Sequence, residues 1–320
     1  METVMSDQIS RARGCLAGQL AGDALGSLVE FQYPEMIASR YPDGVRQMED
    51  GGTWNTIAGQ PTDDSELALD LARAIISNGG YQQEAARDAY QGWYRSDPFD
   101  MGGTISAGLS GTPNYDSQAN GGLMRISPLG VFSTHIDRDL AARYAREDAW
   151  ITHPNDITQD ANVVFVLTIA DVIRDGLNRQ QTFARAIEIA EDQGLHETLC
   201  GWLEDGRNQP PEPFTKSQGW VRIGIQNAMY QLLHADSIED AMADTISRGG
   251  DTDTNAAICG ALYGATCGIE AIPAEWCETL RNCRPEDGKP GVLRPRPERY
   301  WPVDFDDIAT QLLEAGMKSA

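Results

Sequence analysis

The sequence Arg248-Gly-Gly-Asp-Thr-Asp-Thr-Asn255 opens an apolar run of small residues that extends from Ala256 to Gly268. An earlier segment, Pro61-Thr-Asp-Asp-Ser-Glu66, also gathers carboxylates and hydroxyls where a loop becomes a helix. Divalent Mg²⁺ and Mn²⁺ prefer such oxygen ligands. Because Ser, Thr and Asp are also ordinary N-caps, capping explains either segment alone better than a ligand role does. Two such segments, each opening an apolar helix, favour a shared metal site.

Length and composition are those of a soluble globular protein. The chain has 320 residues, of which 41% are hydrophobic and 23% are charged, so it can bury a sizeable core as one large domain or two small ones. No uninterrupted apolar run is long enough to span a membrane, and the polar start of the chain is unlike a secretory signal. We therefore expect a cytoplasmic protein without membrane contact.

The charge balance is strongly acidic. The 48 acidic residues outnumber the 25 basic ones, which gives a net charge of −23. Such a field repels nucleic acid and anionic lipid, so neither is an expected partner, whereas bound cations or a basic protein would suit it. The six cysteines form no C-x-x-C pair and no metal-finger spacing, and we expect buried free thiols in a reducing compartment.

The apolar spacing is helical along the whole chain, and no convincing period-two run indicates a strand. The first segment, 9–31, carries glycine at every fourth position from 14 to 26, which predicts a buried central helix that another helix approaches closely. We therefore predict one all-α domain over residues 1–320. Further helices are expected at 65–78, 82–94, 138–150, 158–175, 181–191, 220–234, 238–247, 252–268, 274–282 and 308–316.

Three segments between these helices suggest functional loops. Residues 32–59 are rich in proline, glycine and charge, and we expect a long loop that serves as a lid. Asp100-Met-Gly-Gly103 and Asn120-Gly-Gly122 are glycine-rich turns that can present backbone N–H groups to phosphate. Loops also contain glycine for conformational reasons alone, so these two turns are suggestive only in combination with other motifs.

Several separated motifs share one order along the chain. They are Gly18-Gln-Leu-Ala-Gly-Asp-Ala-Leu-Gly-Ser-Leu-Val-Glu30, Pro61-Thr-Asp-Asp-Ser65, Asp100-Met-Gly-Gly103, Asn120-Gly-Gly-Leu-Met-Arg125, Thr152-His-Pro154 and Gly249-Gly-Asp-Thr-Asp-Thr254. In this order they resemble the ADP-ribosylglycohydrolases, from about residue 12 to about residue 277. Ser65 departs from the family's more frequent threonine but keeps the hydroxyl. The segments 32–59 and 205–217 do not align convincingly.

The resemblance implies an all-α orthogonal helical bundle around a binuclear Mg²⁺ or Mn²⁺ centre. The catalytic carboxylate is implied to be Glu30 or Asp100, and the choice between them stays open. The implied metal ligands are Thr62, Asp63, Asp64, Asp251, Asp253 and Thr254. The residues implied to bind the substrate are Gly102, Gly103, Asn120, Gly121, Gly122 and His153.

The implied reaction is hydrolysis of the N-glycosidic bond between ADP-ribose and a protein side chain, with arginine as the expected residue. The partner is then an ADP-ribosylated protein. A bacterial role as immunity protein against an ADP-ribosyltransferase toxin fits the lid and the charge, and reversal of a regulatory modification fits nearly as well. Two alternatives remain: a protein that neutralises a toxin by occluding it, with hydrolysis secondary or absent, and an enzyme for a small ADP-ribose conjugate.

A few residues in or near the motifs have structural explanations. His153 can be a loop histidine that packs on Pro154, and Arg125 is expected to pair with a buried acid. Asp23 is interpreted as a hydrogen-bonding residue between helices. The aromatic residues Trp93, Tyr94 and Trp220 are expected in the core rather than against an adenine ring.

Overall fold

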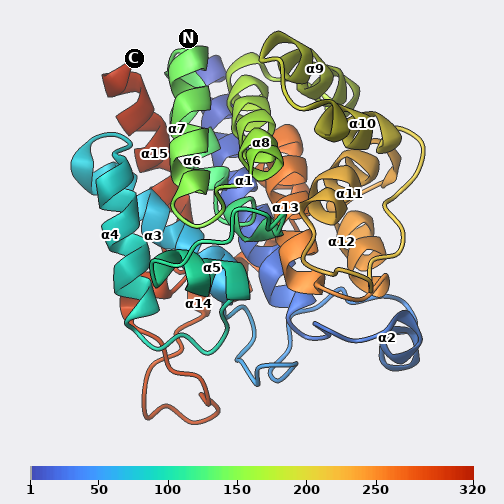
Figure 1. Cartoon of the computed structure of the whole chain (residues 1–320). Coiled ribbons are helices and arrows are strands. Elements are labelled where there is room, and N and C mark those ends of the chain that lie inside the picture. The colour runs from blue at the N-terminus through green and yellow to red at the C-terminus, as the bar shows by residue number, and fades with distance from the viewer. Residues whose placement is uncertain (1) are drawn as a thin grey trace.

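The computed structural model describes residues 2–320, and within that range every regular element is a helix (Figure 1). Fifteen α-helices and four short 3₁₀ turns follow one another, and two isolated bridges, between Gly51 and Thr56 and between Ala119 and Trp220, are the only β-type pairings in the described residues. The predicted all-α fold class is confirmed. Buried apolar side chains from Ala12 to Ala315 form one connected core.

The centre of the molecule is the pair of helices α1 (Glu2–Gly26) and α13 (Thr252–Cys267), which lie side by side in Figure 1. A Cβ added at Gly18 would stand 2.1 Å from the backbone oxygen of Gly260, and one added at Gly22 would stand 2.2 Å from that of Ala256. No larger residue fits at this distance, because the two backbones themselves are in contact. The predicted close approach of a second helix is therefore confirmed.

The other helices surround this pair, and most begin or end within two or three residues of their predicted limits. Four short helices, α2, α5, α6 and α10, were not predicted, and three of them have only six or seven residues, too few turns to show an apolar period. The α-helices are α2 (Pro34–Arg40), α3 (Asp63–Asn78), α4 (Gln83–Tyr94), α5 (Gly103–Leu109), α6 (Ser127–Phe132), α7 (Arg138–Trp150), α8 (Asp156–Asp175), α9 (Arg179–Asp192), α10 (Glu197–Asp205), α11 (Val221–His234), α12 (Ile238–Ser247), α14 (Ala274–Asn282) and α15 (Phe305–Ser319). The 3₁₀ turns are η1 (Asn120–Gly122), η2 (Ser133–His135), η3 (Ile269–Ala271) and η4 (Glu298–Tyr300).

The segment 32–59 is mainly the loop that its composition predicted, with one short helix inside it. It contains α2, and it buries Ile37 and Val45 in the core. Its backbone is also fastened to neighbouring elements: Thr53 N–H donates to the Ser27 carbonyl at 3.1 Å, and the Trp276 indole donates to the Arg46 carbonyl at 2.9 Å. Contacts with distant residues therefore hold this loop in place. A lid role for it stays a prediction.

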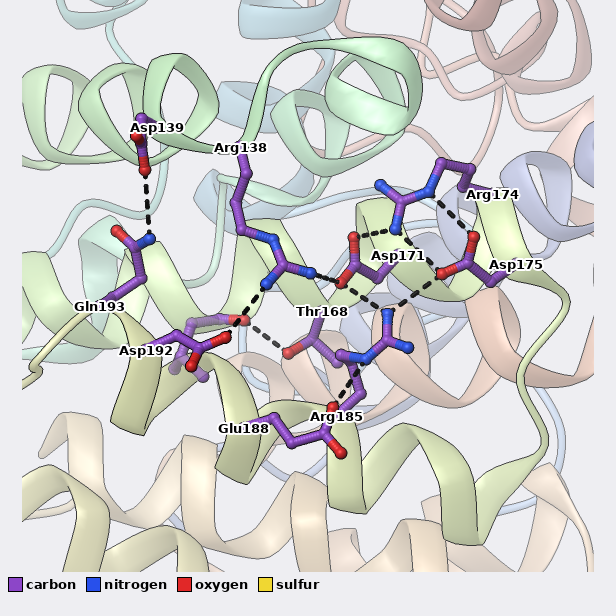
Figure 2. Close-up of polar contacts among 11 residues, drawn as sticks. Arg138, Asp139, Thr168, Asp171, Arg174, Asp175, Arg185, Glu188, Asp192 and Gln193 are labelled. Carbon is purple, nitrogen blue, oxygen red and sulfur yellow. Dashed lines mark hydrogen bonds and ion pairs between the residues drawn. The ribbon is translucent and has the colours of Figure 1, made fainter.

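A network of ion pairs joins α7, α8 and α9 (Figure 2). Asp171 on α8 has a side chain that is only 3% exposed, and it accepts hydrogen bonds from Arg138 of α7 at 2.6 Å and from Arg185 of α9 at 2.8 Å. Arg174 lies 2.5 Å from its second oxygen. A buried carboxylate stays ionised only where cations compensate for its lost hydration. The arginines do this here, and they fix three helices against one another.

All six cysteines are free thiols, as predicted. The expectation that they are buried holds for Cys15, Cys259, Cys277 and Cys283 but is wrong for two: Cys267 is exposed and Cys200 is half-buried. None of the helices in residues 2–320 has an apolar stretch of the length needed to cross a bilayer.

Candidate active site

The site forms where the end of α1 meets the first turns of α3 and α13. Asp23, fully buried on α1, accepts hydrogen bonds from the backbone N–H and hydroxyl of Thr62, at 3.1 Å and 2.9 Å, and from Ser65 N–H at 3.1 Å. It therefore supplies from α1 the capping oxygen that α3 lacks at its own N-cap. Burial raises the pKa of Asp23 to about 6. The predicted helix-to-helix hydrogen bonding is confirmed.

The two oxygen-rich motifs lie against each other in the site. Thr62 Oγ1 is 3.2 Å from Asp64 Oδ2 and 3.4 Å from Asp253 Oδ2, and Thr254 Oγ1 is 3.3 Å from the same oxygen of Asp64. All four side chains are buried. Segments about 190 positions apart in the sequence are thus brought within hydrogen-bonding distance. The glycine contacts between α1 and α13 produce this juxtaposition, since they set where α13 begins.

Two further carboxylates, Glu30 and Asp251, converge on Asp253. Glu30, Asp251 and Asp253 each offer an oxygen within 4.8 Å of the others, and all three side chains are buried. Burial first, and then repulsion from Asp253, Asp100 and Asp251, raises the pKa of Glu30 far above its ordinary value. Burial and the neighbouring aspartates also raise the pKa values of Asp64 and Asp253. Repulsion of this kind is relieved when cations bind among the carboxylates.

Asp63 and Asp100 form a second carboxyl pair at the wall. Their side chains share a hydrogen bond, and Asp63 Oδ2 also accepts one from the backbone N–H of Gly102 at 3.2 Å. Burial raises the pKa of Asp63 to about 7, and burial together with Asp63 raises that of Asp100 to about 11. The N–H of Gly102 was expected to face phosphate, but it is directed at Asp63.

These groups line a cavity of about 600 Å³, a volume suited to a nucleotide-sized ligand. Thr62, Asp64 and Gly122 are not part of its surface, whereas the other candidate residues are. The rest of the cavity wall includes Phe31 and residues 217–219, which belong to none of the motifs. The candidate residues on the lining are Glu30, Asp63, Asp100, Gly102, Gly103, Asn120, Gly121, His153, Asp251, Asp253 and Thr254.

The glycine-rich turn η1 serves packing as well as the cavity. Asn120 donates through Nδ2 to Asp251 Oδ2 at 2.8 Å and through its backbone N–H to the Gly219 carbonyl at 2.8 Å. A Cβ added at Gly121 would stand 3.1 Å from Nε2 of His153, so the turn lies directly on the imidazole. His153 is fully buried and contributes to the cavity lining. His153 lies in the loop between α7 and α8 with its imidazole at the cavity, and its role in substrate binding stays a prediction.

Sequence reasoning missed two residues that border the acidic cluster. Trp54, in the segment 32–59, donates its indole N–H to Glu30 Oε2 at 2.5 Å. Phe31 follows Glu30 with a φ of +64°, a conformation that costs an aromatic residue energy, and its side chain is 54% exposed at the cavity edge. Its N–H donates to the Gly250 carbonyl at 2.7 Å. Neither residue belongs to a motif, so no sequence signal identified it.

The buried pair of Glu66 and Arg296 was also missed. Arg296 lies in the segment 284–302 between α14 and α15, which carries none of the motifs. Of the aromatic residues expected in the core, Trp93 is fully buried and donates to Glu66 at 2.7 Å. Tyr94 and Trp220 are half-buried and pack against the core.

A sequence profile of the ADP-ribosylglycohydrolase family matches residues 5–314, nearly the whole chain. The chain belongs to the ADP-ribosylglycohydrolase family. This match extends beyond residues 12–277, the limits expected from the motifs. A solved structure entitled "ADP-ribosylglycohydrolase-related protein complex" superimposes with a TM-score of 0.79 and 25% identity, covering 98% of this chain and 100% of that one.

Relatives within the ADP-ribosylglycohydrolase family are similar along most of their length. The chain is 29% identical to the putative ADP-ribosyl glycohydrolase L543 of Acanthamoeba polyphaga mimivirus, covering 86% of this chain and 92% of the relative. It is 28% identical to ADP-ribosyl-[dinitrogen reductase] glycohydrolase of Rhodospirillum rubrum, with 84% and 90% covered. It is 26% identical to ADP-ribosylarginine hydrolase Tri1 of Pseudomonas putida, with 85% and 74% covered. These similarities support glycohydrolase activity on ADP-ribosylated substrates.

Proposed function

We propose that this ADP-ribosylglycohydrolase cleaves the N-glycosidic bond between ADP-ribose and an arginine side chain of a modified protein. The observation that carries the proposal is the convergence of Glu30, Asp251 and Asp253 within 4.8 Å at a cavity of about 600 Å³. The arginine specificity is supported by the relatives named ADP-ribosylarginine hydrolase, from Pseudomonas putida and Serratia proteamaculans.

The chain's oxygen groups fit the two divalent cations, Mg²⁺ or Mn²⁺, that we propose as cofactors. Asp64 Oδ1 is buried and has no hydrogen-bond partner among the described residues, as expected of an atom reserved for a cation. Each oxygen type present is one that these hard ions prefer. When bound, the ions would neutralise the carboxylates and supply Lewis acidity. The residues proposed to hold them are Thr62, Asp63, Asp64, Asp251, Asp253 and Thr254.

The chain's own carboxylates account for the bond cleavage. When the bond from C1 of the ribose to the guanidine nitrogen breaks, its electron pair stays with nitrogen and positive charge develops on the sugar. Glu30, held by the Trp54 indole and directed at the cavity, is placed to stabilise that charge. The oxygen of a water molecule then bonds to C1, and the proton that it loses passes through a carboxylate to the released guanidine, which departs as guanidinium. Asp100, the half-buried wall carboxyl, is the proposed proton carrier.

The test is release of free ADP-ribose from an arginine-ADP-ribosylated protein, with Mg²⁺ and after chelation. We expect metal-dependent release that falls at least about 100-fold in Glu30→Gln, the size of a lost acid–base or charge-stabilising group. Glu35→Gln is the matched control, because Glu35 is exposed on α2 and does not line the cavity. A folded, metal-loaded protein that releases ADP-ribose only from serine-linked substrate would refute the arginine proposal.

For the biological setting we propose immunity against an ADP-ribosyltransferase toxin, which the net charge of −23 supports by suiting a basic partner. Hydrolysis and occlusion make different predictions for this role. Asp253→Asn removes one buried carboxylate of the cluster, so it should abolish hydrolysis and leave an occluding surface intact. If the variant folds and still neutralises a toxin, neutralisation depends on occlusion rather than on hydrolysis. Loss of neutralisation together with hydrolysis would support the enzymatic route.

A further inference from the structure

A buried chain of polar contacts leads from Arg125 to His153. Arg125 is fully buried, pairs with Asp148 at 3.2 Å and lies 4.2 Å above the ring of Tyr90, so the predicted pairing with a buried acid is confirmed. Its Nη1 also donates to Thr152 Oγ1 at 2.8 Å. The same hydroxyl oxygen is 2.8 Å from His153 Nδ1.

The donor and acceptor roles in this chain are determined by Arg125. A guanidinium has only donors, so Thr152 Oγ1 accepts from it. The hydroxyl proton of Thr152 then has one acceptor within reach among the described residues, which is Nδ1 of His153. If Nδ1 carried the proton instead, the buried hydroxyl proton would have no acceptor, at a cost typical of a buried unsatisfied donor. The arrangement therefore favours an unprotonated Nδ1, which leaves the imidazole proton on Nε2.

The other ring nitrogen is free for a ligand. Nε2 of His153 is buried and has no hydrogen-bond partner among the described residues, and the imidazole contributes to the lining of the cavity beside Gly121. Burial, and then the charge of Arg125, lower the pKa of His153 well below its ordinary value, so the ring is neutral at physiological pH. A neutral imidazole whose Nδ1 accepts offers one donor, the Nε2–H group.

We infer that Arg125 and Thr152 are positioning residues that hold His153 as the neutral Nε2–H tautomer, so that the cavity contains a fixed N–H donor for an oxygen of the bound substrate. The acceptor is a phosphate oxygen or a ribose hydroxyl oxygen, which share this chemistry. Only the identity of the ligand rests on the proposed function. The tautomer is a property of the free protein.

The tautomer can be read directly from the full-length protein by long-range ¹H–¹⁵N NMR of histidine-labelled chain. We expect His153 to show a protonated Nε2 and an unprotonated Nδ1 without metal or ligand. Thr152→Ser should keep this pattern because the hydroxyl remains, whereas Thr152→Val should lose it. Thr168→Val is the matched control, since it removes another fully buried threonine hydroxyl, on α8, that bonds only to its own helix. A protonated Nδ1 in the wild-type protein would overturn the inference, whatever the variants do.

Ligand titrations identify the acceptor. If a phosphate oxygen accepts, both ADP and ADP-ribose shift the Nε2–H resonance of His153; if the terminal ribose accepts, only ADP-ribose does. Thr152→Val should weaken ADP-ribose binding by about tenfold, the effect of losing one hydrogen bond to the ligand, and Thr152→Ser should restore most of it. No shift with either ligand would overturn the inference. Hydrolysis is not measured here, so failure of the proposed reaction would leave this result unaffected.

Discussion

Arg296 holds Glu66 with two hydrogen bonds, of 2.8 Å to Oε1 and 2.7 Å to Oε2, and both side chains are buried. Glu66 stands in the first turn of α3, two and three positions after Asp64 and Asp63. Arg296 also donates to the Ser96 carbonyl at 2.9 Å, just before the turn that carries Asp100. The C-terminal segment 284–302 therefore fastens two walls of the active site to each other.

Replacing Arg296 with methionine should lower the free energy of unfolding. The change leaves Glu66 buried without its cation, and loss of one partner of a buried pair costs about 3–5 kcal/mol. Denaturant unfolding measures this, and Mg²⁺ binding to the variant should weaken as the first turn of α3 loses its anchor. The control is Arg46→Met, which breaks an exposed pair with Asp240 and should cost less than about 1 kcal/mol. Equal losses in the two variants would contradict the structural role given to Arg296.

The acidic cluster predicts a link between pH and metal dependence. Asp63 and Asp100 have pKa values raised to about 7 and about 11, above the value near 4 of an unfolded chain. Between these limits the folded protein binds more protons than the unfolded one, so the free energy of unfolding of the metal-free protein falls as pH rises from about 4 through 7. Cations relieve this repulsion.

Melting temperatures with Mg²⁺ and with chelator should therefore differ more at pH 8 than at pH 5. Comparing the two conditions at each pH removes the contribution of titrating groups elsewhere in the chain. Isothermal titration in buffers of different ionisation enthalpy should also show proton release on metal binding near pH 6, because ligands must ionise. A gain in melting temperature that is the same at both pH values would show that the cluster is not the metal site.

The glycine contacts between α1 and α13 should tolerate no side chain. In Gly18→Ala the new methyl group would stand 2.1 Å from the backbone oxygen of Gly260, and neither helix can withdraw without losing its other contacts. We expect the free energy of unfolding to fall by about 3 kcal/mol or more. Gly92→Ala in α4 is the control, and it should have the opposite effect. Nothing lies within 4 Å of a Cβ added at Gly92, so its free energy of unfolding should rise by about 0.5–1 kcal/mol. Chemical denaturation of both variants checks this.

Phe31 should contribute to binding and not to folding. Its φ of +64° suits asparagine better than phenylalanine, and its ring is largely exposed. Phe31→Asn should therefore leave the free energy of unfolding unchanged to within about 0.5 kcal/mol while raising KM for the ADP-ribosylated protein. Asn55→Gly, at another left-handed position outside the cavity lining, is the control for backbone effects. An unchanged KM in the asparagine variant would remove Phe31 from substrate binding.

The helical fold and the meeting of the two oxygen-rich motifs could be predicted from the amino-acid sequence alone. Apolar spacing identified most helices because a long helix repeats its buried face over several turns. The glycines of α1 predicted a close helix contact, and the oxygen-rich motifs at 61–66 and 248–255 predicted that two distant helix starts would meet. These are properties of short segments, so local reasoning can reach them.

The partner of each polar side chain in the site became known only from the three-dimensional structure. The contacts of Arg296 with Glu66 and of Trp54 with Glu30 join residues whose spacing in the sequence carries no pattern. Thr152 and His153 are adjacent, but their adjacency does not reveal which of the two donates the hydrogen bond. The Gly102 N–H, available to phosphate in the sequence, is occupied by Asp63. The physical reason is that hydrogen bonds and ion pairs depend on the position of atoms in space to within a few tenths of an ångström. Hydrophobic periodicity determines which helix surfaces are buried, but it does not determine the positions of individual polar atoms.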